Sequence, residues 1–239
     1  FAALEANTTA DNNTGIGTSA LAANTTGTNN AALGKNSLPA NTTGSQNTAL
    51  GTAALENATT ADDNTAIGFA ALNVTTTGAS NTAVGRDALG ANTTASANTA
   101  VGKGAGASVT TGANNVLIGV EAGYHDVATT TGAQVTIVGN YANMDAAGSS
   151  NSNVFGYNAT GTTGTTTLGV NTSLIRATHG NTTWSTVSDE RVKKDITDAT
   201  AGLSFINDLR PVTFKYKQEG NLPKEFIGYK EGSTKTFKK

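Results

Sequence analysis

The residues best suited to chemistry lie near position 190, where a serine precedes a cluster of charged side chains. Ser188 is followed directly by Asp189, and Lys193 stands five residues after the serine, close to Arg191 and Lys194. A serine hydroxyl becomes a nucleophile when a neighbouring base takes its proton, and lysine can be that base where nearby cations favour its neutral form. The pattern is therefore compatible with a serine nucleophile and a lysine base.

A purely structural interpretation of the same residues stays open. Ser188 followed by Asp189 and Glu190 is also how a helix begins, with a capping serine and acids in the first turn. A spacing of five does not place two side chains on one helix face. Ser188 and Lys193 can therefore act together only if the serine lies just before the helix, or if the pair is assembled between chains.

Other candidate sites have weaker support. The chain has no cysteine, and His125 and His179 lack partners at ligand spacing, so we expect neither a metal site nor any other cofactor. The glycine-rich stretch 102–106 is read as an altered turn of a repeat rather than a phosphate loop. Asparagines that begin N-x-T sequons follow the repeat itself, which makes glycosylation a weak prediction; they are Asn7, Asn24, Asn41 and Asn92. Acids of the repeats form no recurring pair and so predict no glycosidase site; they include Glu5, Asp11, Glu56, Asp62, Asp63 and Asp87.

Most of the chain is an internal repeat. A glycine recurs every seventeen residues, four residues after an asparagine, in a unit that reads N-T-A-[ILV]-G-x-x-A-L-x-x-N-T-T-G-x-x. The recurring glycines are Gly17, Gly34, Gly51, Gly68, Gly85, Gly102 and Gly119. Seventeen residues are too few for a two-helix repeat, and Asn, Thr and Gly are poor helix formers. The repeat therefore predicts an all-β solenoid with one 17-residue coil per unit, a β-roll or β-helix.

Stacked coils would align identical positions at the strand spacing of about 4.8 Å, giving ladders of Asn, Thr and aliphatic side chains. Each coil offers its core little more than one leucine, one other aliphatic residue and a few alanines, and aromatics make up only 5% of the chain. Because so thin a core contributes little, we expect the coils to share it with copies of the chain, in a homotrimer. Leu55 is expected in that shared core.

The composition changes near residue 188. Residues 1–187 hold 4 of the 15 basic and 9 of the 17 acidic side chains, a net charge of −5, whereas the last 52 residues hold 11 basic and 8 acidic ones. We predict regular repeats over 1–119, degenerate repeats and a neck over 120–187, and a small α+β segment over 188–239. In that segment, 199–208 has helical spacing, and 212–216 alternates as a half-buried strand. The opening residues match 69–72 in mid-repeat, so we expect the chain to be part of a longer protein.

Two resemblances connect these parts to known families. The stretches 184–196 (WSTVSDERVKKDI) and 209–216 (LRPVTFKY) resemble the opening of the intramolecular chaperone auto-processing domain of phage tail spikes and tail fibres such as endosialidases. That resemblance implies a domain that trimerises, templates folding of the fibre and is released by serine-lysine self-cleavage. It implies Ser188 as nucleophile, Lys193 as general base and Asp189 beside the cut. The repeats resemble the N-[ST]-x-A-[IV]-G coils of trimeric autotransporter heads, with a longer spacing.

Three function classes follow from the sequence. The first is a structural trimeric fibre of a phage tail, which attaches to a host polysaccharide or receptor and ends in its folding chaperone. The second is a bacterial surface adhesin or secreted filament of the same build. The third is an ice- or surface-binding solenoid using the Thr-Thr pairs, which we place lower because adjacent threonines in a strand would point to opposite faces. The charge pattern predicts no nucleic-acid partner, and no apolar run is long enough for membrane insertion.

Overall fold

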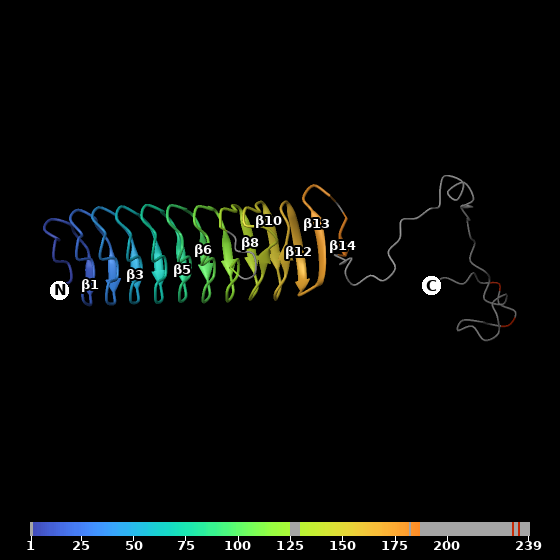
Figure 1. Ribbon diagram of the computed structural model, residues 1–239, viewed down its shortest axis with the longest axis horizontal. Coiled ribbons are helices and arrows are strands. Elements are labelled where there is room, and N and C mark those ends of the chain that lie inside the picture. The colour runs from blue at the N-terminus through green and yellow to red at the C-terminus, as the bar shows by residue number, and fades with distance from the viewer. Residues whose placement is uncertain (1, 125–129, 182, 187–230, 232–233, 235–239) are drawn as a thin grey trace. The chain divides into compact units, whose positions relative to one another are not determined.

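The computed structural model describes residues 2–124, 130–181, 183–186, 231 and 234 (Figure 1). The chain divides into two compact units, Phe1–Asp189 and Glu190–Lys239. The helix predicted over 199–208 and the strand predicted over 212–216 lie outside the described residues. The account that follows therefore concerns the first unit.

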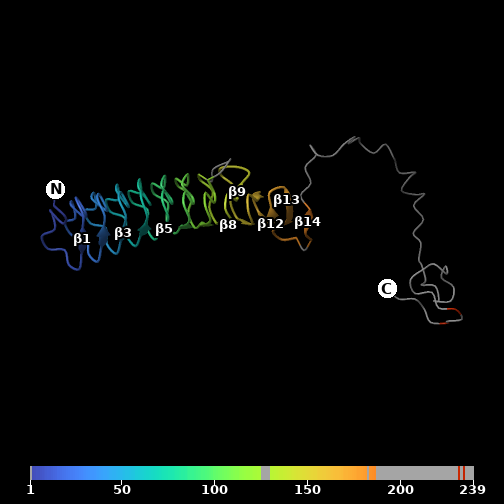
Figure 2. The same cartoon turned by 90° about the horizontal axis from the view of Figure 1, so that it is seen from below.

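The first unit is a β-solenoid in which each coil contributes one short strand to a continuous sheet (Figures 1 and 2). The strands that stack in parallel are β1 (Thr14–Ile16), β2 (Ala31–Leu33), β3 (Thr48–Leu50), β4 (Thr65–Ile67), β5 (Thr82–Val84), β6 (Thr99–Val101), β7 (Val116–Ile118), β8 (Val135–Val138), β10 (Ser152–Phe155) and β12 (Thr165–Val170). Thr65 pairs with Thr82, and Ile67 with Val84, so equivalent positions of successive repeats lie beside each other in the sheet. The predicted 17-residue β-solenoid is confirmed.

The parallel stacking continues where the glycine spacing becomes irregular. Ile118 pairs with Val138, and Phe155 pairs with both Val138 and Leu168, so longer and shorter coils still place their strands in register. The small parallel strands β9 (Asn143–Met144) and β11 (Thr160–Gly161) form a second sheet in this region. Variation in coil length is therefore absorbed outside the main sheet.

The solenoid sheet ends in antiparallel strands. β13 (Ser173–Thr178) folds back on β12, and β14 (Ser185–Thr186) pairs with β13. Arg176 joins β13 to the coils before it, because its Nη2 donates to the Thr160 carbonyl and its Nε donates to the Thr167 hydroxyl. This change of direction ends the parallel repeat at the C-terminal side.

A ladder of buried asparagines holds successive coils together. The Asn64 side-chain oxygen accepts the backbone N–H of Asn81 at 3.0 Å, while its Nδ2 donates to the Gly78 carbonyl at 2.9 Å. The same pattern recurs in neighbouring coils, from Asn30 to Asn115. A buried backbone group without a partner is costly, so one asparagine per coil satisfies two groups that the short strand leaves unpaired.

The repeated glycine is required by both conformation and space. Gly68 has φ +132°, and a Cβ built there would lie 2.6 Å from the carbonyl oxygen of Gly85 in the next coil. Ordinary L-residues rarely adopt that φ, and the stacked backbones leave no room for a side chain. The glycine file therefore marks the corner at which each coil turns out of the sheet.

The leucine file lies inside the coil. Leu21, Leu38, Leu55, Leu72 and Leu89 are fully buried within one chain. The expectation that Leu55 belongs to a core shared between chains is therefore wrong. The leucines and alanines of successive coils form one buried cluster within the single chain. The buried asparagine ladder completes this core. Each leucine has a positive φ near +50°, a conformation that is particularly unfavourable for β-branched side chains, which explains why Ile and Val do not occur in this file.

The Thr-Thr pairs lie at bends outside the strands, so the reasoning from strand alternation is wrong for them. From Thr25 to Thr110 the first threonine donates its hydroxyl proton to a carbonyl of the next coil, as Thr59 does to Thr76 and Thr76 to Thr93. The second is exposed, as at Thr60 and Thr94. The pairs therefore present a single exposed threonine file along one edge of the solenoid.

Candidate functional site

The residues predicted to carry chemistry, Ser188, Asp189 and Lys193, lie outside the described residues. The structure does describe residues 183–186, which precede them in the sequence. β14 pairs with β13 through Ile175–Thr186 and Arg176–Ser185, so the sheet of the solenoid extends to two residues before Ser188. Trp184, which opens the stretch 184–196, is half exposed. Along the sequence, Ser188 therefore follows the last described strand by two residues, and Asp189 is the last residue of the first compact unit.

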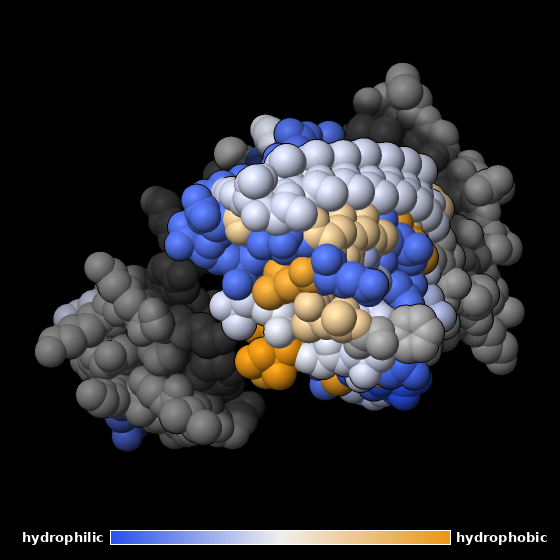
Figure 3. Space-filling model, turned by 90° about the vertical axis from the view of Figure 1, so that its left-hand side faces the viewer, coloured by the Kyte–Doolittle hydropathy of each residue, from blue (hydrophilic) through white to orange (hydrophobic). Residues whose placement is uncertain are grey.

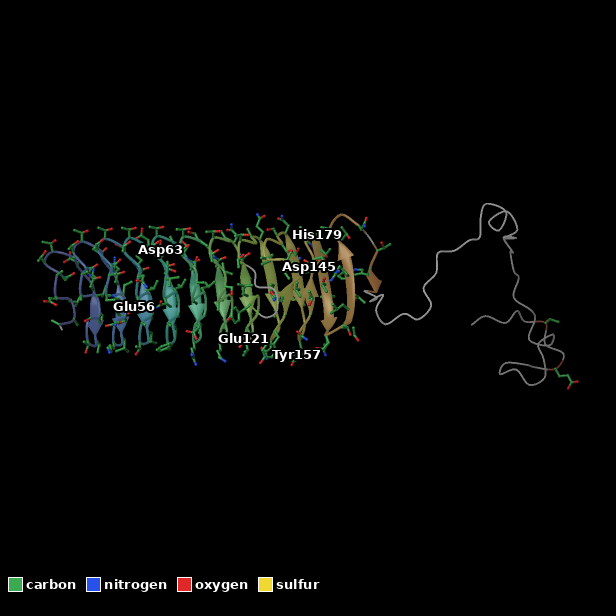
Figure 4. The ribbon with its side chains drawn as sticks, viewed as in Figure 1. Glu56, Asp63, Glu121, Asp145, Tyr157 and His179 are labelled. Atoms are coloured by element: carbon green, nitrogen blue, oxygen red, sulfur yellow. The ribbon has the colours of Figure 1, made fainter. Side chains whose placement is uncertain are left out.

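The other polar candidates are dispersed or already satisfied. Figure 4 shows Glu56, Asp63 and Glu121 set apart along the solenoid. In the part of the chain that the structure describes, no three His, Asp or Glu side chains gather as metal ligands would. His179 places its Nε2 3.1 Å from the Thr166 hydroxyl at the surface.

Three of the four sequon asparagines are part of the interior. Asn24, Asn41 and Asn92 are fully buried. The Nδ2 of Asn41 donates to the Asn24 side-chain oxygen at 2.8 Å and to the Gly44 carbonyl at 2.8 Å. The Oδ1 of Asn41 has no partner, because Ala58 stands where the next asparagine of this ladder would donate. In the folded coil these nitrogens are inaccessible to a glycosylating enzyme.

The most distinctive surface is the outward face of the main sheet, which we call the strand face. From β2 to β7 the middle residue of each strand, such as Ala66 or Ala83, is buried, while the residues on either side of it point away from the coil. The outward residues form two files along the sheet. The polar file comprises Thr14, Ala31, Thr48, Thr65, Thr82, Thr99, Val116, Thr136, Asn153 and Thr166. The aliphatic file comprises Ile16, Leu33, Leu50, Ile67, Val84, Val101, Ile118, Val138, Phe155 and Leu168.

The aliphatic file is substantially exposed in the single chain. Ile16 is 57% exposed, Leu50 40% and Ile118 38%, and Phe155 continues the same file at 37%. A shallow apolar groove runs between the two files over β1 to β3. Neither file contains a charged residue. Because contiguous exposed apolar surface on a soluble protein marks an interaction site, the strand face is the candidate functional surface.

Charged and aromatic side chains lie instead at the glycine corner, beside the strand face. Arg86 forms an ion pair with Asp87 at 2.9 Å, and its guanidinium carbon lies 5.8 Å from the centre of the Phe69 ring. Tyr141 and Tyr157 pack edge to face in later coils. Figure 3 shows side chains of similar hydropathy aligned in rows along the coil axis. The apolar strand face therefore has a polar border, as protein interfaces commonly do.

Sequence reasoning missed the strand face because it treated all aliphatic residues of the unit as core. A signal for it was present in the phrase T-A-[ILV]. In a strand, alternate residues point to opposite faces, so a buried alanine places the threonine and the aliphatic residue on the outside. The interior of the coil is narrow and holds the small alanine side chain, so the larger aliphatic side chain next to it lies on the outer face of the strand.

Comparison with known proteins concerns the C-terminal part of the chain. Residues 188–229 match the family model described as chaperone of endosialidase. The match begins at Ser188, two residues after β14, and covers less than a fifth of the 239 residues. No curated protein and no solved structure matches the chain. The chain thus combines a fibre-like β-solenoid with a segment similar to the chaperone of endosialidase.

No described helix is long and apolar enough to cross a membrane.

Proposed function

We propose that the protein is a structural fibre that assembles as a homotrimer through the strand face, and that its C-terminal chaperone segment templates this assembly. The observation that carries the proposal is the pairing of an uncharged apolar file along a β-solenoid with the chaperone match that begins where the sheet ends. In this proposal the fibre is a phage tail fibre that attaches to a host-surface polysaccharide or receptor. A bacterial surface adhesin of the same build is the alternative, supported by the resemblance of the repeats to trimeric autotransporter heads.

The amount of exposed apolar surface favours assembly along the whole strand face. Complete burial of a large aliphatic side chain contributes about 1.5–3 kcal/mol, so covering an exposed two fifths to half contributes roughly 0.6–1.5 kcal/mol. Six layers of the aliphatic file are exposed to about that extent, namely those of Ile16, Leu33, Leu50, Val101, Ile118 and Phe155. Together they contribute roughly 4–9 kcal/mol per chain. Association costs about 4–15 kcal/mol. A contact over a few coils would therefore be weak, whereas one along the full file contributes a free energy of the same order as the cost of association.

The periodicity of the strand face favours a second copy of the same chain as the partner. Its side chains form ridges spaced about 4.8 Å apart along the coil axis. A surface that fits these ridges over ten layers must have the same repeat, and a parallel copy has it by construction. The absence of charged residues in both files means that identical surfaces meet without electrostatic repulsion.

The chaperone segment supplies what the repeats lack. Coils with nearly equal contacts can pair in several axial alignments, so a C-terminal domain that trimerises first would align the chains at one end. In the proposed cleavage, Lys193 accepts the hydroxyl proton of Ser188, and the serine oxygen attacks the carbonyl carbon of a Ser188–Asp189 peptide bond. The resulting ester forms as the C–N bond breaks, Lys193 returns the proton to the leaving amine of Asp189, and water then hydrolyses the ester. Release of the chaperone would leave the fibre kinetically trapped in its assembled state.

Light scattering of the purified chain tests the assembly. We expect the mass of a trimer for the unaltered protein and a loss of trimer for Val84→Asp, which places a carboxylate in the aliphatic file. Thr60→Asp, on the exposed threonine edge of a nearby coil, is the matched control and should leave the mass unchanged. A stable folded monomer of the unaltered chain would contradict the proposal.

Mass spectrometry of a chain extended to the complete chaperone domain tests the cleavage. We expect Ser188→Ala and Lys193→Ala to leave trimer assembly intact while abolishing the cut. Cleavage that persists in Ser188→Ala would remove the proposed nucleophile, and cleavage lost only in Lys194→Ala would move the base by one residue.

A further inference from the structure

The strand face changes character at a single layer of the stack. From β1 to β8 its aliphatic file contains only Ile, Leu and Val, and its polar file contains only Thr, Ala and Val. In β10 both files change together: Phe155 takes the aliphatic position and Asn153 the polar one. Threonine and leucine return in β12, as Thr166 and Leu168. This layer has the only aromatic ring and the only carboxamide among the paired residues of the two files.

The uniform layers give assembling copies little axial information. Thr48, Thr65, Thr82 and Thr99 occupy successive positions of one file, and the aliphatic residues beside them differ by at most one methylene. A copy displaced by one coil along these layers would replace each contact with a nearly equal one. Its only loss would be the contact of the overhanging coil. The features that distinguish one alignment from another must lie where the files are irregular.

We infer that the layer formed by Asn153 and Phe155 sets the axial register of the fibre, by pairing only with the same layer of the other copies. This inference rests on the proposed trimeric assembly through the strand face. It assigns the alignment of the chains to two residues of the solenoid itself, in addition to any alignment by the chaperone segment.

Size and polarity both act at this layer. Phe155 is 37% exposed, and its ring is larger than the side chain of Val138, the residue that pairs with it in the preceding layer. In an aligned trimer the three rings meet in one layer, whereas a displaced copy presents its ring to valine or leucine and leaves a gap at the partner's ring layer. The Asn153 Nδ2 donates to the Thr166 hydroxyl at 3.1 Å, which orients the carboxamide. A displaced copy would bury that carboxamide against a layer without a matching amide, which is how a single buried asparagine fixes register in coiled coils.

Chemical cross-linking measures the register directly, because the chain contains no cysteine. Thr65→Cys and Thr99→Cys are made in separately tagged full-length chains, which are then coexpressed and treated with a bismaleimide. The reagent is the shortest one that joins Thr65→Cys to itself in a homotrimer. Positions 65 and 99 lie two coils apart in the polar file, about 10 Å along the axis in aligned copies. Cross-links between the two tags therefore report displaced copies.

We expect few such cross-links with Asn153 and Phe155 in place, and at least a tenfold increase in the Asn153→Thr, Phe155→Val background. Leu50→Val is the matched control, because it removes a methylene from a uniform layer and should leave the register unchanged. Adding Val84→Phe to the double variant should restore alignment by moving the aromatic layer to β5. Light scattering of each variant verifies that it is still a trimer, and Phe155→Leu replaces the double variant if that protein fails to assemble.

The outcomes separate this inference from the proposed function. A monomeric unaltered chain would overturn the proposed assembly and the register inference with it. Trimers that stay aligned in the Asn153→Thr, Phe155→Val background would leave the assembly standing and overturn the inference, since the register would then come from the chaperone segment alone. Failure of Val84→Phe to restore alignment would also count against the aromatic layer.

Discussion

From the asparagine ladder we predict that the buried side chain of Asn64 contributes strongly to the stability of the solenoid. Asn64 is fully buried, and its truncation to alanine removes the partners of two backbone groups, the Asn81 N–H and the Gly78 carbonyl. Each buried group left without a partner costs about 1–3 kcal/mol. We therefore expect Asn64→Ala to lower the free energy of unfolding by about 2–6 kcal/mol.

Asn57→Ala is the matched control for this substitution. The Asn57 amide also donates to a carbonyl of the next coil, that of Asn73 at 2.9 Å, but it does so at the exposed surface. Water can replace that partner, so the expected change is within about 0.5 kcal/mol.

The assay is thermal unfolding of the full chain followed by circular dichroism, at one protein concentration and scan rate. A loss of 1 kcal/mol lowers the midpoint by about 2–4 °C in a domain of this size, so Asn64→Ala should unfold at least about 4 °C earlier than the unaltered chain. Asn57→Ala should unfold within about 2 °C of it. Equal midpoints for the two variants would refute the reasoning, because they would show that the buried ladder contributes no more than a surface amide.

Two further predictions concern backbone conformation and use the same assay. Leu72→Ile should lower the midpoint more than Ile67→Leu, because Leu72 has φ +51° and a β-branched residue is strained there, whereas position 67 lies in a strand; equal effects would argue against the strain. Gly68→Ala should prevent stable folding or cost several kcal/mol, because its Cβ would lie 2.6 Å from the Gly85 carbonyl oxygen, while Ala70→Gly, at another positive φ, should be tolerated or stabilising at that backbone position. A normally folded Gly68→Ala protein would contradict the close approach of the two backbones.

The sequence by itself determined the period, the coil and the position of its corner. A glycine recurs every seventeen residues, with an asparagine four residues before it. If identical positions stack in successive coils, each asparagine can form the same hydrogen bonds to the next coil, and each glycine can leave room for the backbone of the next coil. The structure has this arrangement: Gly68 lies against Gly85, and the Asn64 side chain accepts the backbone N–H of Asn81, each at the equivalent position of the next coil. The resemblance of the C-terminal segment to the chaperone of endosialidase was also recognisable from its residues, and residues 188–229 match that family model.

Only the tertiary structure decided which aliphatic residues face inward. Leu72 and Ile67 are both large and apolar and both recur once per unit, so composition cannot separate them. The backbone conformation separates them. Leu72 has a positive φ and its side chain is buried in the coil, whereas Ile67 follows the buried Ala66 in a strand, so its side chain points to the outer face. The sequence argument placed Leu55 between chains because it weighed the amount of apolar side chain without the direction that the strand and the corner give to each residue. That direction closes the core within one chain and leaves the aliphatic residues of the strand face exposed.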